Sequence, residues 1–222
     1  MIITGVGSLP FTDPVAAVEY VMKYDIPFMP ELTNAGESMN NYLARSEPLA
    51  AAKHFAEHSL EVAKLQCVGP VTAMNMGLSE DEATLKIIDH ISKHLKYINA
   101  KKVILFLDEP VLGYSGLPFV KMWENVFEEF DVSRGIHTCN MLWDQLLEAP
   151  IEIINFDASQ YDITRYYEAR DKRLAWGVQK FEDIKDWKDG DLITSPCGLA
   201  QYSEKECEEI LDNLKSIKGR LH

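Results

Sequence analysis

Residues 102–110 read KVILFLDEP, a mainly apolar run that ends in two acidic residues and a proline. The run has the length and composition of a buried strand, and a proline soon after it marks a turn. The sequence therefore predicts a strand over 102–107 that presents Asp108 and Glu109 just beyond its carboxyl end.

Short apolar runs of this kind alternate with amphipathic stretches along the chain. Such alternation indicates a parallel sheet covered by helices, and eight strands with eight helices is the number of a closed (β/α)8 barrel. The expected strands are 2–6, 26–30, 63–68, 102–107, 134–138, 151–156, 173–178 and 191–195. The expected helices are 13–24, 36–60, 80–98, 117–129, 140–148, 160–171, 181–187 and 203–218.

We expect residues 1–222 to form a single TIM barrel domain with short loops, because 222 residues leave little room for insertions. A doubly wound open sheet is the alternative. The barrel is favoured because the chemically interesting residues nearly all follow an expected strand, where a barrel gathers them in one ring of loops. These residues are Gly7, Ser8, Glu31, Gly69, Pro70, Asp108, Glu109, His137, Cys139, Asp157, Gln179 and Cys197.

The charge balance limits the classes of partner. The chain has 22 basic and 35 acidic side chains, a net charge of −13, so its surface repels nucleic acid and anionic membranes. No apolar run reaches the length of a membrane span, and the amino terminus does not resemble a signal peptide. We expect a cytoplasmic protein whose four cysteines are thiols or metal ligands rather than disulfides.

Three residues form a candidate zinc site. His137 and Cys139 lie two apart at a strand end, so both side chains point to the same side. That pair alone also fits a buried thiol beside a hydrogen-bonded histidine. Cys197, between a proline and a glycine, supplies a third ligand and leaves one position open, as in catalytic zinc sites. Asp157 either fills that position or acts from outside the ligand set.

The remaining cysteines and histidines fit this chemistry less well. Cys67 lies inside an expected strand and Cys207 in the last expected helix, so both are interpreted as core or surface thiols. The pairs His54–His58 and His90–His94 have helical i, i+4 spacing but no acidic partner that completes a metal-binding motif. They are interpreted as solvated or structural histidines.

Seven segments appear in the order found in a known family. They are GVGSLP, KLQCVGPVT, LDEP, the His-X-Cys strand, INFDAS, LAWGV and SPCGL. The chain thus resembles the C-terminal catalytic barrel of cobalamin-independent methionine synthase, within the uroporphyrinogen-decarboxylase-like superfamily of zinc methyltransferases. The resemblance covers nearly the whole chain. It implies a minimal version of the catalytic core, without the synthase's long N-terminal domain.

The resemblance implies a role for each matching position. His137, Cys139 and Cys197 match zinc ligands, and Asp157 falls where the family has a ligating glutamate. Asp108 matches the carboxylate that holds the amino group of homocysteine, so Asp108 and Asp157 are the candidate catalytic residues. The candidate substrate-binding residues are Gly7 and Ser8 for the substrate carboxylate, Asp108, and either Glu31 or Glu37.

The expected reaction is zinc-dependent methyl transfer to the thiol of homocysteine, which forms methionine. The family has a histidine after the seventh strand that protonates the folate leaving group, whereas this chain reads AWGVQKFEDI there. A methylcorrinoid, either methylcobalamin or a methylated corrinoid protein, is therefore the expected donor. The alternatives are a corrinoid-linked methyltransferase with another thiol acceptor such as coenzyme M, and a non-catalytic zinc- or corrinoid-binding subunit.

Overall fold

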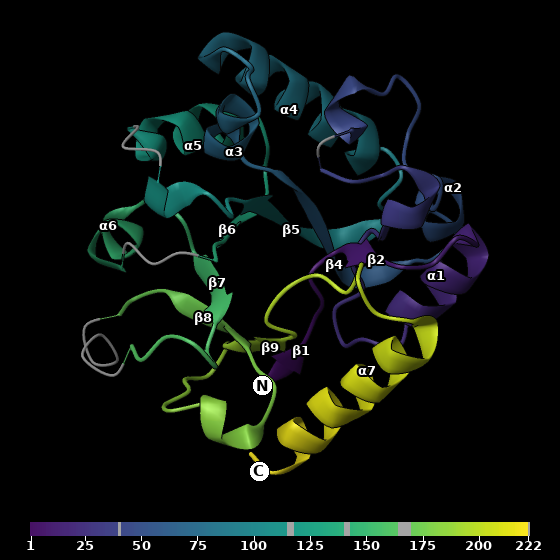
Figure 1. Ribbon diagram of the computed structural model, residues 1–222, viewed down its shortest axis with the longest axis vertical. Coiled ribbons are helices and arrows are strands. Elements are labelled where there is room, and N and C mark those ends of the chain that lie inside the picture. Colours follow the sequence, from purple (N-terminus) through teal and green to yellow (C-terminus); the bar gives the residue numbers. More distant parts are fainter. Residues whose placement is uncertain (40, 115–117, 140–142, 164–169, 222) are drawn as a thin grey trace.

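The computed structural model describes residues 1–39, 41–114, 118–139, 143–163 and 170–221. A curled parallel sheet lies at its centre and helices surround it (Figure 1). The seven strands are β1 (Ile2–Ile3), β4 (Leu60–Val68), β5 (Ala100–Asp108), β6 (Ser133–His137), β7 (Ile153–Asp157), β8 (Arg173–Gly177) and β9 (Leu192–Thr194). Their spatial order is β1-β9-β8-β7-β6-β5-β4, which lacks the reversal of a doubly wound sheet.

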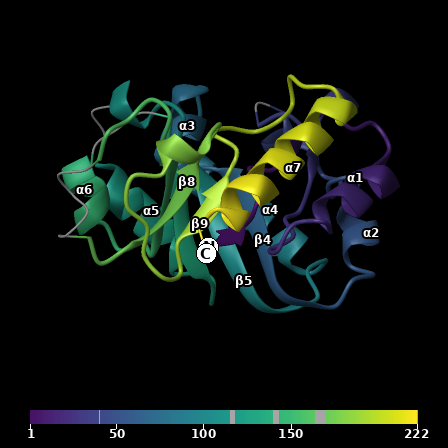
Figure 2. The same ribbon diagram turned by 90° about the horizontal axis from the view of Figure 1, so that it is seen from below.

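The helices form the outer layer. They are α1 (Pro14–Val21), α2 (Ala52–Phe55), α3 (Pro70–Asn75), α4 (Glu80–Leu95), α5 (Phe119–Phe127), α6 (Trp143–Glu148) and α7 (Glu204–Gly219). Viewed from below, α1 and α2 lie on one side of the strands and α5 and α6 on the other (Figure 2). The last helix, α7, packs against both β1 and β9 and so joins the two ends of the chain.

The closed eight-stranded barrel is not formed, because the strand ladder is open between β1 and β4. The expected strand at 26–30 makes a single bridge, between Phe28 and Lys64. It still lies in the gap: the Ile26 amide donates to the Ile3 carbonyl, and the Lys64 amide donates to the Pro27 carbonyl. Proline lacks an amide hydrogen, so Pro27 and Pro30 prevent a regular ladder here. The sheet is a half-barrel, compatible with a TIM-barrel-like fold.

The helix expected over 36–60 is wrong for most of its length. The described part of that segment contains only a 3₁₀ turn at Tyr42–Ala44 and the short α2. Gly36 has φ 82°, a left-handed conformation, and Pro48 cannot continue a helix. The segment instead wraps around the buried Glu37 carboxylate, which accepts hydrogen bonds from the amides of Leu32 and Ala50.

Several short elements differ from expectation as well. A two-stranded parallel pair, β2 (Ser8–Leu9) and β3 (Glu31–Leu32), and the helix α3 were not expected. The expected helix 181–187 is a single 3₁₀ turn, Phe181–Asp183. Residues 164–169 of the expected helix 160–171 and residues 140–142 of the expected helix 140–148 lie outside the described residues.

Side chains of the strands alternate between two environments, as the two-residue period of a strand requires. Those that face outward join the main core beneath the helices, which includes Leu105, Ile136 and Trp176. Those that face inward form a smaller apolar cluster, Ile26, Ile104, Phe106, Ile153, Ala175 and Leu192. Two residues further along the strands, the buried inward-facing side chains are polar. A polar layer therefore lies above the smaller apolar cluster.

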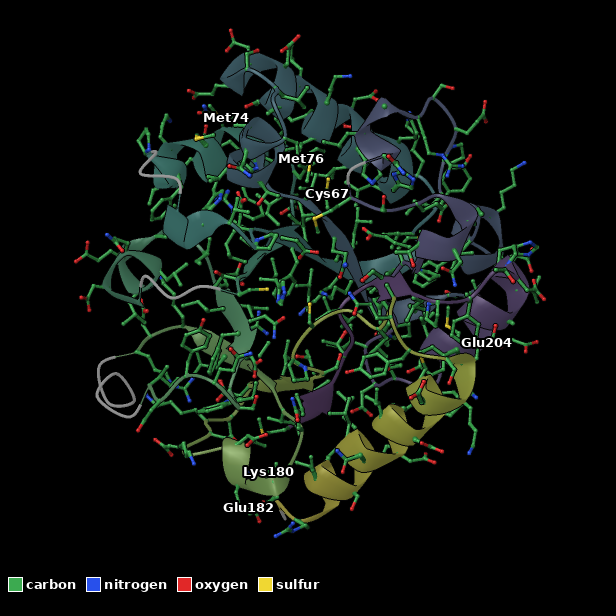
Figure 3. The ribbon with its side chains drawn as sticks, viewed as in Figure 1. Cys67, Met74, Met76, Lys180, Glu182 and Glu204 are labelled. Carbon is green, nitrogen blue, oxygen red and sulfur yellow. The ribbon has the colours of Figure 1, made fainter. Side chains whose placement is uncertain are left out.

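Cys67 and Cys207 are buried core thiols, which decides between the core and surface alternatives that the sequence left open. Cys67 lies on the α3 side of the molecule (Figure 3). His90 and His94 are buried on α4, where the His94 ring accepts a hydrogen bond from the Leu49 amide and has a structural role. In the part of the chain that the structure describes, no helix has both the length and the apolar character needed to span a bilayer.

Glu109 fastens α3 to the sheet. Its buried carboxylate accepts hydrogen bonds from the amides of Val71 and Thr72, the Thr72 hydroxyl and the Trp123 indole. A Cβ atom at Gly69 would lie 2.2 Å from this carboxyl group, so only glycine fits there. Glu109 is thus structural, and it fixes the chain directly after Asp108.

Replacing Glu109 with glutamine is expected to lower the free energy of unfolding by about 2 kcal/mol, because one acceptor oxygen becomes a donor that faces buried donors. Urea unfolding measures the change. Glu61→Gln is the control, since its pair with Lys101 is solvent-exposed and should contribute little. Equal stability of the Glu109→Gln variant and the control would contradict this role.

Candidate metal centre

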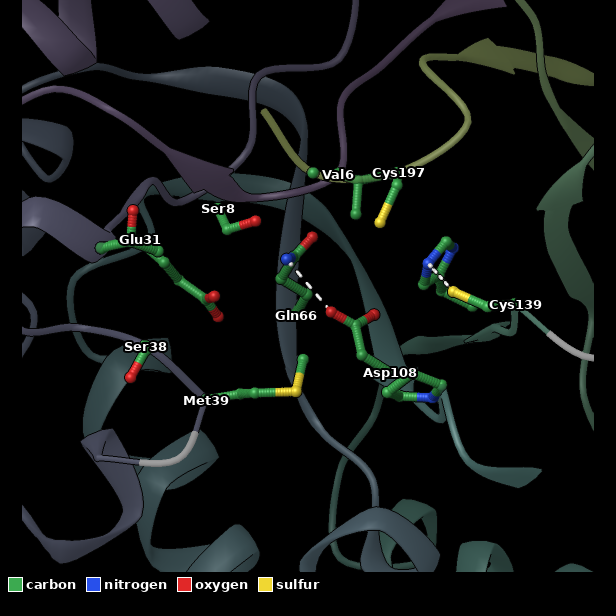
Figure 4. Close-up of a pocket in the computed structure, with 13 residues that line it drawn as sticks. Val6, Ser8, Glu31, Ser38, Met39, Gln66, Asp108, Cys139 and Cys197 are labelled. Atoms are coloured by element: carbon green, nitrogen blue, oxygen red, sulfur yellow. Dashed lines mark hydrogen bonds between the residues drawn. The ribbon is translucent and has the colours of Figure 1, made fainter. Parts of the chain in front are cut away.

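A cavity of about 170 Å³ opens at the carboxyl ends of the strands. Its polar lining includes Ser8, Glu31, Asp108, His137, Cys139 and Cys197, which come from distant parts of the chain (Figure 4). The parallel register explains part of this gathering, because Asp108 of β5 is paired with His137 of β6 and Ser8 of β2 with Glu31 of β3. The half-barrel thus places most of the expected site residues around one space.

His137, Cys139 and Cys197 form the group expected to bind metal. One ligand atom from each lies within 4.8 Å of the others, and Cys139 Sγ is 3.8 Å from His137 Nε2. In a tetrahedral zinc site with Zn–S bonds of about 2.3 Å, two sulfurs lie about 3.8 Å apart. The three side chains therefore fit a zinc ion after small side-chain movements, and an imidazole with two sulfurs is a donor set that zinc favours.

Asn155 orients the histidine and was not identified from the sequence. Its side-chain amide donates to the Ala175 carbonyl and the Thr194 hydroxyl, which leaves its Oδ1 as an acceptor 2.6 Å from His137 Nδ1. His137 Nδ1 must then carry a proton, and Nε2, which faces the cysteines, is the nitrogen available to a metal ion. A polar amide inside the otherwise apolar run IINFD of β7 was the available signal.

Asn155→Leu is expected to weaken zinc binding by about 10- to 100-fold, because His137 loses the partner that fixes its tautomer and ring orientation. Competition with a zinc chelator of known affinity measures the change. Asn155→Asp keeps an acceptor for Nδ1–H but loses the donor to the Ala175 carbonyl, so it should recover only part of the affinity. Equal zinc affinity of the leucine variant and the wild type would contradict the orienting role of Asn155.

The Cys139 and Cys197 thiols differ in acidity. Hydrogen bonds from Cys139 and His137 lower the pKa of Cys197 to about 4, while the bond to Cys197, together with burial, raises the pKa of Cys139. These hydrogen bonds favour the thiolate form of Cys197, with Cys139 as the proton donor to it. Such a site favours a cation, because only a positive ion neutralises both sulfurs once the shared proton is gone.

Asp157 is not in the group of three ligands. Its Oδ1 accepts from the Ser159 amide and hydroxyl, and its Oδ2 accepts from the Gln160 side chain. It lines a second cavity, of about 440 Å³, which Cys197 and Gly198 also line. In this arrangement the carboxylate holds the start of the loop after β7 and leaves the fourth metal position to another ligand.

Asp108 and Glu31 each present an unsatisfied oxygen. Both residues are 3% exposed, and Asp108 Oδ1 and Glu31 Oε1 have no hydrogen-bond partner among the described residues. Burial raises the pKa of both carboxyl groups, and Asp108 raises that of Glu31 further. Buried carboxylate oxygens without a donor are costly, so this part of the cavity is suited to a cationic ligand that donates hydrogen bonds.

The structure separates the two candidate glutamates. Glu31 lines the cavity, whereas both oxygens of Glu37 are occupied by the amides of Leu32 and Ala50. Glu37 is fully buried in the loop and does not line the cavity. Glu31 is thus the carboxylate that can meet a ligand.

Gly7 and Ser8 also differ in position. Ser8 lines the cavity and packs against Gly198, where a Cβ atom would clash with the Ser8 hydroxyl. The Gly7 amide is used inside the protein, because it donates to Gln66 Oε1 at 2.6 Å. Only Ser8 of this pair faces the space where a ligand would lie.

Comparison with known proteins supports the fold. No family model matches the chain, and no curated protein matches it. One solved structure that matches is a B12-independent methionine synthase from Shewanella sp. W3-18-1 in complex with selenomethionine. The similarity covers 100% of this chain and 99% of that chain, with a TM-score of 0.67 and 13% sequence identity. At this identity the similarity establishes a shared fold alone.

Proposed function

We propose that this protein is a zinc-dependent methyltransferase that methylates the thiol of homocysteine to form methionine. The observation that carries the proposal is the position of the His137, Cys139 and Cys197 group in the same cavity as the unsatisfied oxygens of Asp108 and Glu31. A metal site for a thiol and a carboxylate site for an ammonium group together fit an aminothiol. The shared fold with a methionine synthase is consistent with this substrate.

The three ligands fit zinc by distance and by donor type. A zinc ion held by His137, Cys139 and Cys197 would supply the deprotonation of a coordinating thiol at neutral pH, which would make the sulfur nucleophilic. Two thiolates and a neutral imidazole balance the charge of Zn²⁺. The zinc with its three protein ligands would then be neutral, so a coordinated substrate thiolate would keep its negative charge.

The chain's own residues bind and orient the amino acid. Asp108 and Glu31 accept hydrogen bonds from the substrate ammonium through Oδ1 and Oε1, the two oxygens that lack partners. Lys64, which is 2% exposed, compensates one of the two negative charges, so one ammonium brings these buried groups to neutrality. The Ser8 hydroxyl donates to the substrate carboxylate at the rim. An anionic thiol such as coenzyme M, which has no ammonium group, is disfavoured by the same pair of carboxylates.

The identity of the methyl donor has to be determined by experiment. The matching solved structure is of a B12-independent enzyme and gives no support to the expected methylcorrinoid. The region after β8 reads VQKFEDI and contains no histidine that could protonate a folate leaving group. Methylcobalamin and methyl-tetrahydrofolate therefore have to be compared directly.

The test is turnover by the purified, zinc-loaded protein with homocysteine and each donor in turn, with methionine measured by mass spectrometry. Methionine formation with one donor, abolished by removing zinc and restored by adding it, is the expected result. A zinc-loaded protein that forms no methionine with either donor would contradict the proposed activity and favour a non-catalytic role.

The two glutamates give a matched pair of variants. Glu31→Gln is expected to raise the KM for homocysteine by about tenfold, since a charged hydrogen bond to the ammonium is lost. Glu37→Gln should leave KM unchanged and lower the melting temperature, because it weakens the loop that Glu37 holds. Steady-state kinetics and thermal unfolding of both variants check this. The opposite pattern would assign substrate binding to Glu37.

A further inference from the structure

Gln66 lines the cavity between Ser8, proposed to bind the substrate carboxylate, and Asp108, proposed to bind its ammonium group. It lies on β4, is 2% exposed, and lines the cavity together with Asp108 (Figure 4). Its Nε2 donates to Asp108 Oδ2 at 3.2 Å. Its Oε1 accepts from Lys64 Nζ at 2.8 Å and from the Gly7 amide at 2.6 Å.

These bonds fix which way the Gln66 amide faces. Rotating the amide by 180° would bring its NH₂ group against the Lys64 ammonium and the Gly7 N–H, both of which are donors. Lys64 is itself held, because its ammonium also donates to the Gly5 carbonyl at 2.7 Å and lies 4.6 Å from the centre of the Phe106 ring. The Gln66 NH₂ group therefore faces Asp108 in a single orientation.

The consequence is a fixed carboxylate. Asp108 Oδ2 is occupied by Gln66, and Oδ1 is the oxygen without a partner among the described residues. A carboxylate at the end of a side chain otherwise rotates broadly about its last bond. Gln66 limits this rotation and leaves Oδ1 to meet a ligand.

Packing adds to the constraint. A Cβ atom at Gly7 would lie 2.5 Å from the Gln66 amide, so the backbone at Gly7 packs directly against this side chain. Gln66 thereby links β4, the Gly7–Ser8 turn and β5 at the cavity floor. One residue connects the part of the site that faces the substrate carboxylate with the part that faces its ammonium.

We propose that Gln66 is a positioning residue that aims Asp108 Oδ1 at the substrate ammonium and thereby sets the preference for thiols that carry an amino group. This inference rests on the proposed function and extends it. Lys64 holds the Gln66 amide in its orientation and so acts on Asp108 only through Gln66.

The experiment compares Gln66→Met, which has a similar volume but no amide, with Gln66→Glu, which keeps the acceptor for Lys64 and Gly7 and, when ionised, cannot donate to Asp108. Thr4→Val is the matched control, because the Thr4 hydroxyl makes a buried hydrogen bond to the Ile26 carbonyl away from the cavity. Zinc content, KM and kcat are measured with homocysteine and with propanethiol, which lacks the ammonium and carboxylate groups.

Both Gln66 variants are expected to raise the KM for homocysteine by about tenfold, with kcat, zinc content and the KM for propanethiol close to wild type. In an Asp108→Asn background, Gln66→Met should add less than about a twofold further change, because the two residues act as one unit. Equal KM increases for both thiols, or full additivity with Asp108→Asn, would overturn the proposal.

A failure of the proposed function is distinguishable from a failure of this inference. If the wild-type protein neither binds homocysteine nor transfers a methyl group, the function is wrong, and crystal structures of the wild type and Gln66→Met then decide the role of Gln66. A rotated Asp108 carboxylate in the variant supports the positioning role, and an unchanged carboxylate overturns it.

Discussion

Cys197→Ser is expected to abolish metal binding, with zinc falling from about one ion per chain to below about 0.1. The serine hydroxyl remains protonated at neutral pH and is a poor zinc ligand, so only His137 and Cys139 remain. Methyl transfer should fall to background in the same variant. Zinc content by mass spectrometry and a chelator competition assay measure the loss.

A second cysteine variant separates this effect from a general loss of thiols. Cys207 is buried in α7 and belongs to the hydrophobic core, away from the cavity. Cys207→Ala should retain full zinc and activity, with at most a lower melting temperature. A Cys197→Ser protein that purifies with one tightly bound zinc would show that the metal is held elsewhere.

Asp108→Asn is expected to reduce kcat/KM for homocysteine by about 100-fold, equivalent to about 3 kcal/mol, because a buried charge opposite the ammonium is lost. The substitution preserves shape, so zinc content should not change. Binding of homocysteine by calorimetry, together with steady-state kinetics, measures the effect. The KM for a thiol without an amino group should stay near the wild-type value.

The control for Asp108→Asn is another buried aspartate. Asp183 is 4% exposed, accepts hydrogen bonds from the amides of Gln179 and Lys180, and lines neither of the two cavities beside Cys197. Asp183→Asn should leave kcat/KM unchanged. Equal losses in the two variants would mean that Asp108 acts on stability rather than on the substrate.

The candidate metal site could be predicted because its signals are local. His137 and Cys139 lie two apart at a strand end, and Cys197 lies between a proline and a glycine after another strand. Parallel strands place their carboxyl ends on one side of a sheet, so these positions converge without any detail of packing. The structure brings together the three residues that this rule indicated.

The other parts of the site depend on register and contact, which the sequence does not show. Asn155 meets His137 because β6 and β7 pair these two residues directly. Glu31 faces the cavity because β3 pairs with β2, and strands of two residues are too short to leave a pattern. Gln66 resembles any other buried polar residue until its partners on β5 and the first loop are known.

The sequence predicted the α/β class of the fold, but it did not predict that the sheet remains open between β1 and β4. The strand expected over 26–30 occupies the gap between β1 and β4, yet its prolines remove the amides that a ladder needs. The helix expected over 36–60 failed because a buried carboxylate, Glu37, organises that segment as a loop. Both differences come from backbone hydrogen bonding, which hydrophobic patterns do not report.

X-ray absorption at the zinc edge tests the central claim most directly, because it reports the atoms around the metal in the zinc-loaded protein. We predict two sulfur neighbours at about 2.3 Å and one imidazole nitrogen at about 2.0–2.1 Å, with a third sulfur after homocysteine is added. An oxygen- and nitrogen-only environment, or a sulfur count that homocysteine does not change, would contradict the account.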